Sequence, residues 1–79
     1  MILQNSIRQV RKTKGLTQQQ LASLVYVTSR TIIALEKGEY NPSPLLAYRL
    51  SLALEVPMEE LFRLKENKEQ EDKKYEAFQ

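Results

Sequence analysis

Apolar residues recur every three or four positions along most of this chain, which is the spacing of one helix face and not the alternation of a strand. The first such stripe consists of Leu3, Ile7 and Val10. Asn5 can cap the start of a helix there, and Gly15 is a typical stop signal. The pattern predicts a first helix that begins near Asn5 and ends just before Gly15.

Two short helices with a tight connection are predicted next, and the rest of the chain is organised around them. Thr17 and Gln20 have the spacing of a capping box, in which each side chain binds the other residue's backbone N–H. Thr28 can cap the third helix, which we expect to end at Lys37 and Gly38. The residues expected to face the core are Leu21, Leu24 and Val25 in the second helix and Ile32 and Leu35 in the third.

A serine followed by a proline, at positions 43 and 44, is a strong signal for a fourth helix, because proline fits the first helical position. A fifth helix should run from Met58 to about Leu64. The residues after it are nearly all charged, so we expect a solvated extension or a frayed helix. The chain therefore divides into a helical domain, residues 1–64, and a charged C-terminal extension, residues 65–79.

The fourth helix, which should end near Leu54, has apolar residues on two opposite faces. At 100° per residue, one face carries Leu46, Ala47, Leu50, Ala53 and Leu54, and the other carries Leu45, Tyr48 and Leu52. The first face suits the core. We hypothesise that the second is a homodimer interface, extended by Tyr75 and Phe78. The alternative is that the C-terminal extension folds back and covers this face within one chain.

Composition narrows the function classes. The chain has 79 residues and neither cysteine nor histidine, so it lacks disulfides, thiolates and the usual general base. We expect no cofactor, no metal and no enzymatic activity, since only Asp, Glu, Lys, Tyr, Ser or Thr could act. No apolar run approaches the roughly 20 residues of a membrane span, and the N-terminal apolar stretch is too short for a signal peptide. These features favour a soluble cytoplasmic protein.

The net charge of +2 is unevenly distributed along the chain. Residues 1–44 carry six Lys and Arg against two Glu, a formal +4, whereas residues 45–64 and 65–79 carry −1 each. The basic half contains the predicted pair of short helices, which favours an anionic partner.

Two helices joined by a turn of three or four residues form a known DNA-reading unit, in which the first turns of the second helix face base edges in the major groove. Ser29 and Arg30 supply suitable side chains, because arginine can bind guanine O6 and N7 together. Ala34, one turn later, is small enough to contact a thymine methyl. Arg30 also lies at a helix N-terminus, where the macrodipole disfavours a cation, so we favour a functional role for it. Gln18 and the N–H groups beside it suit a phosphate.

A series of short matches to one family runs through residues 5–62. The matching residues are Arg11, Lys14, Gly15, Leu16, Thr17, Gln18, Leu21, Ala22, Val27, Thr28, Thr31, Ile32, Leu35, Glu36, Gly38, Asn41, Pro42, Ser43, Val56, Glu59, Glu60, Leu61 and Phe62. Each match is weak alone, but in this order and spacing they resemble the Cro/phage-repressor (XRE) family of helix-turn-helix regulators. The resemblance implies an all-α, lambda-repressor-like domain of five helices that binds double-stranded operator DNA as a homodimer.

The resemblance also implies roles for individual residues. Bases would be read by Ser29, Arg30 and Ala34; we add Ile33, which can reach a thymine methyl or pack against its neighbours. Phosphates would be contacted by Thr17, Gln18, Lys37 and Asn41, to which we add Thr31 and Tyr40.

Arg11 and Glu36 match a pair that forms an internal salt bridge in such domains. As exposed charges they would contribute only about 0–1 kcal/mol, and we favour the buried pair because each shares a helix with inward-facing residues. Arg8, Lys12 and Lys14 can be an ordinary solvated face, and only some of them need touch DNA.

Three departures from the family pattern and one rival function remain. Tyr26 lies where the family usually has glycine, and since a left-handed backbone is costly for tyrosine, we expect a reshaped turn. Ile33 lies where the family often has a polar residue, and Pro44 where it often has leucine. The rival function is a protein-binding module, such as the antitoxin of a toxin pair, with the face of Leu45 and Leu52 and the C-terminal extension as its partner site.

Overall fold

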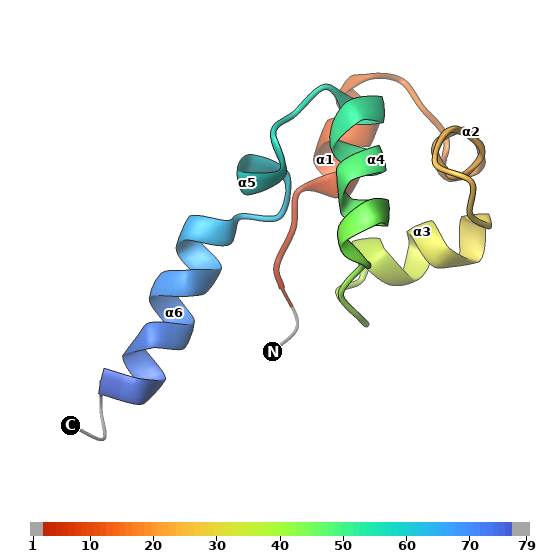
Figure 1. Ribbon diagram of the computed structural model, residues 1–79. Coiled ribbons are helices and arrows are strands. Elements are labelled where there is room, and N and C mark those ends of the chain that lie inside the picture. Colours follow the sequence, from red (N-terminus) through yellow and green to blue (C-terminus); the bar gives the residue numbers. More distant parts are fainter. Residues whose placement is uncertain (1–2, 77–79) are drawn as a thin grey trace.

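The chain consists of helices and connecting loops throughout residues 3–76, the part that the computed structural model describes. The helices there are α1 (Ile7–Thr13), α2 (Gln18–Leu24), α3 (Ser29–Glu36), α4 (Pro44–Leu54), α5 (Met58–Leu61) and α6 (Leu64–Glu76). Figure 1 shows α1 to α5 gathered into one body, from which α6 extends toward the C-terminus. The all-α prediction is confirmed.

Short-range hydrogen bonds fix the starts of three helices where the sequence predicts them. The Thr17 hydroxyl accepts a hydrogen bond from Gln20 N at 3.0 Å, and Gln20 Oε1 accepts one from Thr17 N at 2.8 Å. These two bonds complete the predicted capping box of α2. Thr28 and Ser43 cap α3 and α4 by accepting from the N–H three residues later.

The N-cap of the first helix is Ser6, one residue later than the predicted cap Asn5. The Asn5 side chain still accepts a hydrogen bond from Ile7 N at 3.1 Å, so it satisfies a backbone donor at the start of α1. The helix ends before Gly15, whose backbone is left-handed with φ +71°.

The five helices α1 to α5 share one apolar core. Each helix from α1 to α5 contributes fully buried side chains, and so does the C-cap residue of α2, Val25. The fully buried side chains are Ile7, Leu21, Val25, Ile32, Leu35, Leu50, Leu54 and Leu61. Packing of α2 and α1 against α3, and of α4 against α5, encloses this core. In Figure 1, α3 runs across the lower end of the body with no helix beneath it.

The inward orientation predicted for Leu24 is wrong. Its side chain is 53% exposed, whereas Leu21, Ala22 and Val25 are buried. At 100° per residue the buried three span an arc of roughly 100°, and Leu24 lies roughly 60° outside it. The small side chain of Ala22, rather than the larger one of Leu24, therefore completes the core face of α2.

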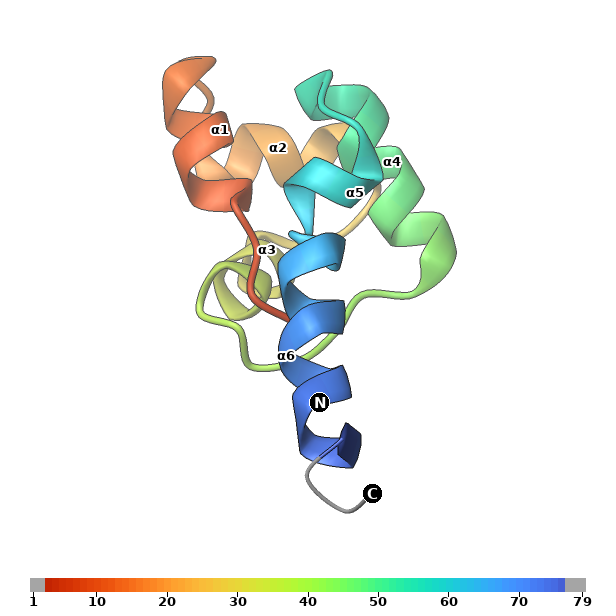
Figure 2. The ribbon, with the colours of Figure 1, turned by 90° about the vertical axis from the view of Figure 1, so that its left-hand side faces the viewer.

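The fifth helix ends at Leu61 and not near Leu64 as predicted. Arg63 adopts a left-handed backbone with φ +49°, which stops α5 and redirects the chain into α6. The described part of the charged extension therefore belongs to a helix of 13 residues, Leu64–Glu76. Figure 2 shows α6 leading away from the lower end of α5.

A buried asparagine ties α6 to the rest of the chain. Asn67 Nδ2 donates hydrogen bonds to the carbonyl oxygens of Gln4, Phe62 and Arg63 at 3.1, 2.9 and 2.9 Å. Its Oδ1 accepts a further bond from Gln4 N at 3.2 Å. Since Gln4 precedes α1 and Phe62 follows α5, this one side chain joins three parts of the fold.

The connection between α2 and α3 keeps the left-handed residue that the family's glycine would provide. Tyr26 has φ +63°, so the expectation of a reshaped turn is wrong. The tyrosine ring is exposed and lies beneath the guanidinium of Arg49 on α4, with 5.0 Å between Arg49 Cζ and the ring centroid. This cation–π contact opposes part of the strain of the left-handed backbone.

No helix within residues 3–76 is long and apolar enough to cross a membrane. The same residues contain no cluster of three acidic side chains that could hold a metal ion.

Candidate nucleic-acid interface

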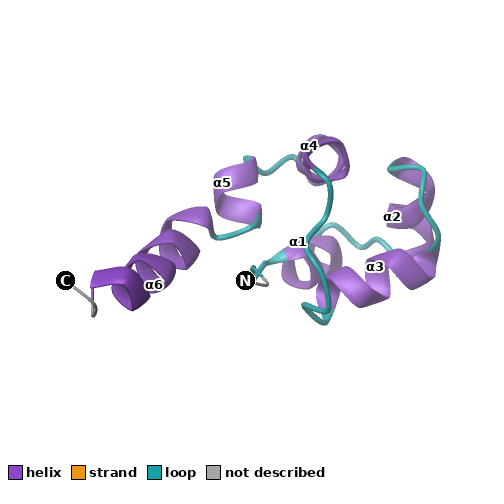
Figure 3. Cartoon of the chain, turned by 60° about the horizontal axis from the view of Figure 1, so that its bottom comes forward, coloured by secondary structure: helices purple, strands orange, loops and turns teal. Residues whose placement is uncertain are grey.

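The third helix presents one side to the outside of the domain. Arg30 is exposed, while Ser29, Ile33 and Ala34 are half-buried. Ile32 and Leu35 on the opposite side are fully buried, so packing fixes the rotation of α3 about its axis. Figure 3 shows α3 beside α2 at the edge of the fold. The four residues predicted to read bases thus belong to the accessible side of a rigidly held helix.

A buried ion pair joins α1 to the end of α3. Arg11 Nε donates to Glu36 Oε2 at 2.6 Å and Arg11 Nη2 donates to Glu36 Oε1 at 3.1 Å. The side chains are only 9% and 4% exposed. Arg11 Nη1 also donates to the carbonyl oxygen of Leu16 at 2.9 Å, which holds the loop before α2. The two-pronged geometry suits a guanidinium and a carboxylate that have both left water.

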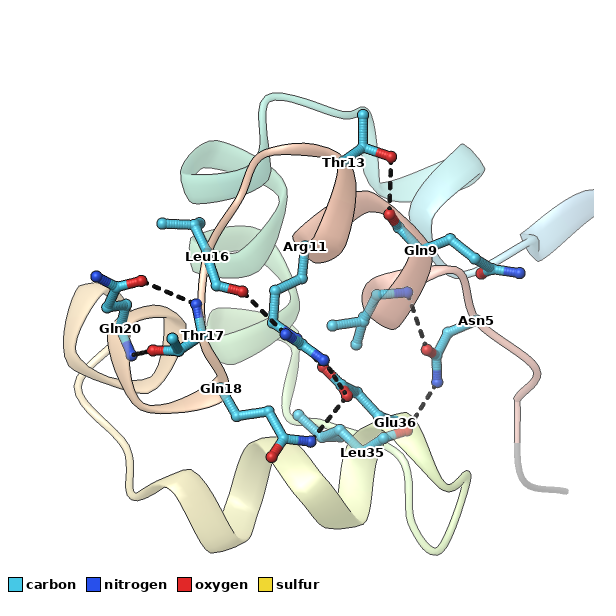
Figure 4. A network of polar contacts seen from close by, with 11 residues as sticks. Asn5, Gln9, Arg11, Thr13, Leu16, Thr17, Gln18, Gln20, Leu35 and Glu36 are labelled. Carbon is cyan, nitrogen blue, oxygen red and sulfur yellow. Dashed lines mark hydrogen bonds and ion pairs between the residues drawn. The ribbon is translucent and has the colours of Figure 1, made fainter.

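The same carboxylate also positions a residue of the second helix. Gln18 Nε2 donates to Glu36 Oε1 at 3.1 Å, as Figure 4 shows from close by. The first residue of α2 is therefore hydrogen-bonded to the last residue of α3. Through Arg11, Glu36 and Gln18, the helices α1, α2 and α3 are fixed relative to one another at a single point.

A cleft of about 500 Å³ opens over this ion pair. Residues from α1, α2 and α3 and from their adjoining loops line it: Arg8, Arg11, Thr17, Gln18, Ile33, Glu36 and Lys37. The cleft brings together three residues predicted to contact phosphate and one predicted to contact a base. Arg8 lines the same cleft, whereas helix periodicity alone does not distinguish it from the neighbouring cations Lys12 and Lys14.

The other residues predicted to contact phosphate lie outside this cleft. The Thr31 hydroxyl lies 3.3 Å from that of Thr28, beside the start of α3. Tyr40 and Asn41 are exposed in the loop after α3, where Asn41 Oδ1 accepts a hydrogen bond from Leu3 N at 2.7 Å. Thr31 on α3 and Tyr40 and Asn41 in the following loop do not line the cleft.

Several cations around α3 have no acidic partner. Arg8, Arg30 and Lys37 form no ion pair within residues 3–76, whereas Arg11 is neutralised by Glu36 and Lys14 pairs with Glu55 at 3.4 Å. On α1, on α3 and at the C-cap of α3, these three cations therefore carry positive charge that no ion pair among the described residues offsets. Such a surface attracts anions, and the attraction weakens as salt concentration rises.

The second apolar face of α4 is accessible in the single chain. Leu45, Tyr48 and Leu52 are 57%, 54% and 60% exposed. Figure 1 shows α6 directed away from α4, so the alternative in which the extension covers this face is wrong for the described residues. Tyr75 is also exposed, near the end of α6, and Phe78 lies outside the described residues.

Comparison with known proteins identifies relatives of most of the chain. A family model described as Helix-turn-helix matches residues 7–61. An HTH-type transcriptional regulator from Methanothermobacter thermautotrophicus is 53% identical over 62 residues, which cover 77% of this chain and 90% of that protein. The HTH-type transcriptional regulator YgzD from Bacillus subtilis is 39% identical over 64 residues, covering 81% of this chain and 97% of the relative.

A solved structure has the same arrangement of helices. The restriction-modification controller protein C.AhdI from Aeromonas hydrophila superposes with a TM-score of 0.66 and 34% sequence identity. The match covers 71% of this chain and 85% of the controller protein.

Proposed function

The chain belongs to the helix-turn-helix family of Cro/phage-repressor (XRE) type, and from this premise we propose that it represses transcription as a homodimer bound to a near-palindromic operator. It is a transcriptional regulator with a helix-turn-helix DNA-binding fold. The finer proposal concerns which residues touch DNA, how two copies assemble and what binding does.

The observation that carries the proposal is the accessible N-terminal half of α3. Arg30 is exposed, has no ion pair within residues 3–76 and follows Ser29 at the start of the helix. In the major groove, the first turns of such a helix face base edges. Arg30 would bind guanine, Ser29 would bind a neighbouring base, and Ile33 and Ala34 would contact thymine methyl groups.

Phosphate contacts would hold the helix in register on the duplex. The proposed contacts come from three segments: Thr17 and Gln18 at the start of α2, Thr31 on α3 with Lys37 at its C-cap, and Tyr40 and Asn41 in the following loop. Contacts of this kind orient the protein and carry no sequence information directly.

The exposed face of α4 would join two copies. Three large side chains, Leu45, Tyr48 and Leu52, are more than half exposed on a helix whose other face is buried. A two-fold axis through this face would bury both copies of the patch at once. Two recognition helices about 34 Å apart would then face successive major grooves. The symmetry would explain why the operator should be a near-palindrome.

Selection of duplexes from a random pool tests the function. We expect recovery of a near-palindrome with half-sites one helical turn apart, bound far better than bulk DNA at two salt concentrations. Substituting Arg30→Ala should weaken binding by about 1–3 kcal/mol and relax specificity at one base pair of each half-site. Equal weakening on every sequence would contradict the base-reading role.

A double charge substitution tests the assembly. Leu45→Glu with Leu52→Glu should give monomers by analytical ultracentrifugation while leaving the helical circular dichroism signal unchanged. Both side chains point to solvent in the single chain, so the fold does not depend on them. A double variant that stays dimeric would exclude this face as the interface. Binding of a second kind of polypeptide in place of the second copy would favour the protein-binding alternative.

A further inference from the structure

The cleft between α1 and α3 contains more positive charge than the predicted phosphate contacts account for. Arg8 reaches it from the first turn of α1, and Lys37 from the C-cap of α3. Arg8 and Lys37 are both exposed, and neither forms an ion pair within residues 3–76. Two cations on different helices therefore share one cavity with no internal partner for either.

The acid in the cleft does not offset these cations. Both oxygens of Glu36 accept hydrogen bonds from Arg11, and the pair is almost fully buried. The pair is neutral as a unit and forms part of the cleft lining. The remaining formal charge on the lining residues is +2, from Arg8 and Lys37.

Two neutral donors are held in the same cleft. The amide nitrogen of Gln18 has two hydrogens, one of which is used in the bond to Glu36 Oε1. The Thr17 hydroxyl oxygen accepts from Gln20 N, which leaves its own hydrogen to donate. Since Gln18 and Thr17 are fixed by these bonds, their spare donors are preorganised for an acceptor entering the cleft.

We propose that a backbone phosphate of the bound DNA enters this cleft and that Arg8 is a phosphate-binding residue acting together with Lys37, Gln18 and Thr17. The inference rests on the proposed function, because Ile33 of the base-reading helix borders the same cleft. A phosphate held between α1 and α3 would fix both helices against the DNA backbone. Arg8 would therefore set the depth at which α3 sits in the groove.

The acceptor is a phosphate of a polymer and not a free anion. Attraction between solvent-exposed charges is weak in water and is screened further by salt, so two cations hold a single phosphate poorly. A duplex delivers the phosphate together with base contacts and other backbone contacts, and it gains from released counterions. The cleft should therefore bind inorganic phosphate weakly.

Arg8→Ala and Lys12→Ala form a matched pair of variants for the test. Lys12 is exposed on α1 one turn after Arg8, has the same charge and does not line the cleft. Affinity for the selected operator and for a scrambled duplex would be measured by fluorescence anisotropy at several KCl concentrations. Thermal unfolding of each variant would establish that the fold is retained, as the exposure of both side chains leads us to expect.

We expect Arg8→Ala to weaken binding to both duplexes by a similar factor, on the order of tenfold, because a charge-assisted hydrogen bond is lost. The slope of log affinity against log salt should become shallower by about 0.9, the value for one phosphate. Lys12→Ala should change affinity less than threefold and leave the slope nearly unchanged. Equal effects of the two substitutions would overturn the inference, because the loss would then reflect general charge alone.

A second measurement distinguishes a DNA phosphate from a free phosphate ion. It also distinguishes failure of the phosphate site from failure of the proposed function. Inorganic phosphate titrated into the wild-type protein at constant ionic strength should leave the NMR signals of the Arg8 side chain unshifted in the low millimolar range. Saturable shifts there would assign the cleft to a free anion and overturn the inference. An operator bound equally well by wild type and Arg8→Ala would also overturn it while leaving the proposed function intact. If wild type prefers no sequence but Arg8→Ala still reduces the salt slope, the proposed function fails and the phosphate site stands.

Discussion

Two pairs of consecutive helices in this protein share a backbone conformation at their junction and differ in their side-chain chemistry. In each, α2–α3 and α5–α6, a residue other than glycine adopts a left-handed backbone at the junction, Tyr26 in the first pair and Arg63 in the second, as Glu55 also does between α4 and α5. Both junctions follow a short helix and redirect the chain within a few residues. The backbone device is therefore shared, and the side chains around it make the difference.

The two pairs of helices differ in how far their cations form ion pairs. Around α3, Arg30 and Lys37 have no acidic partner within residues 3–76. On α6, Lys68 pairs with Asp72 and Lys74 with Glu71, and the helix carries more acids than bases. Pairing within α6 raises the pKa of Lys68, mainly through its hydrogen bond to Asp72. The two pairs differ in degree, because neither of these cations near α3 is paired, whereas two of the four lysines of α6, Lys68 and Lys74, are paired within the helix.

The buried polar contacts of the two pairs also differ in kind. In the first pair, Gln18 of α2 donates to Glu36 of α3, and the same carboxylate forms the buried ion pair with Arg11 of α1. The α5–α6 pair is held by the neutral side chain of Asn67. A buried charge pair is costly to break on one side, whereas a neutral amide costs less to remove. Stability should therefore be more sensitive at the first pair.

The largest effect is expected from Glu36→Ala. Removal of this carboxylate leaves Arg11 buried without a counter-charge and should lower the free energy of unfolding by roughly 3–5 kcal/mol. Urea unfolding followed by circular dichroism measures this loss of unfolding free energy. Glu55→Ala, which breaks the exposed pair with Lys14, is the control and should change stability little. A loss below about 1 kcal/mol for Glu36→Ala would mean that water reaches Arg11 and that the pair is effectively a surface contact.

Asn67→Asp should have the next largest effect and would sharpen the comparison at the second pair. The substitution puts an oxygen where Nδ2 now donates to three carbonyl oxygens, so bonds are lost and acceptors face one another. We expect a loss of about 1–3 kcal/mol in unfolding free energy. Hydrogen exchange should show opening of α6 ahead of α1 to α4. Asn67→Ala removes the bonds without the repulsion and should cost less than Asn67→Asp.

The two pairs also differ in how far the sequence predicts them. The caps at Thr17 and Thr28 are contacts over three residues, so residue type and spacing suffice to find them. The contact between Asn67 and Gln4 spans 63 positions, and an asparagine among charged residues is typical of a solvated helix. Nothing local in the sequence distinguishes that asparagine from an exposed one.

Within the candidate interface the same limit applies to single side chains. Accessibility of Arg30 follows from helix periodicity, because Ile32 and Leu35 must face the core. The inclusion of Arg8 in the cleft depends on how α1 crosses α3, which periodicity within either helix does not determine. The inward orientation predicted for Leu24 is wrong for a related reason, because the neighbouring helix determines how wide an arc of α2 is buried.

The smallest effect concerns the left-handed junction itself, where Tyr26 can be replaced in two ways. Tyr26→Ala keeps the backbone strain and removes the contact with Arg49, so it should lower stability by about 0.5–1 kcal/mol. Tyr26→Gly removes the same contact and relieves the strain, which is worth roughly 1–2 kcal/mol for a residue with a Cβ, although glycine gains freedom in the unfolded chain. The glycine variant should therefore be the more stable of the two in thermal unfolding. If alanine and glycine give equal melting temperatures, the relieved strain is no larger than the cost of the freedom that glycine gains in the unfolded chain, and the left-handed backbone shared by the two helix pairs has little effect on stability.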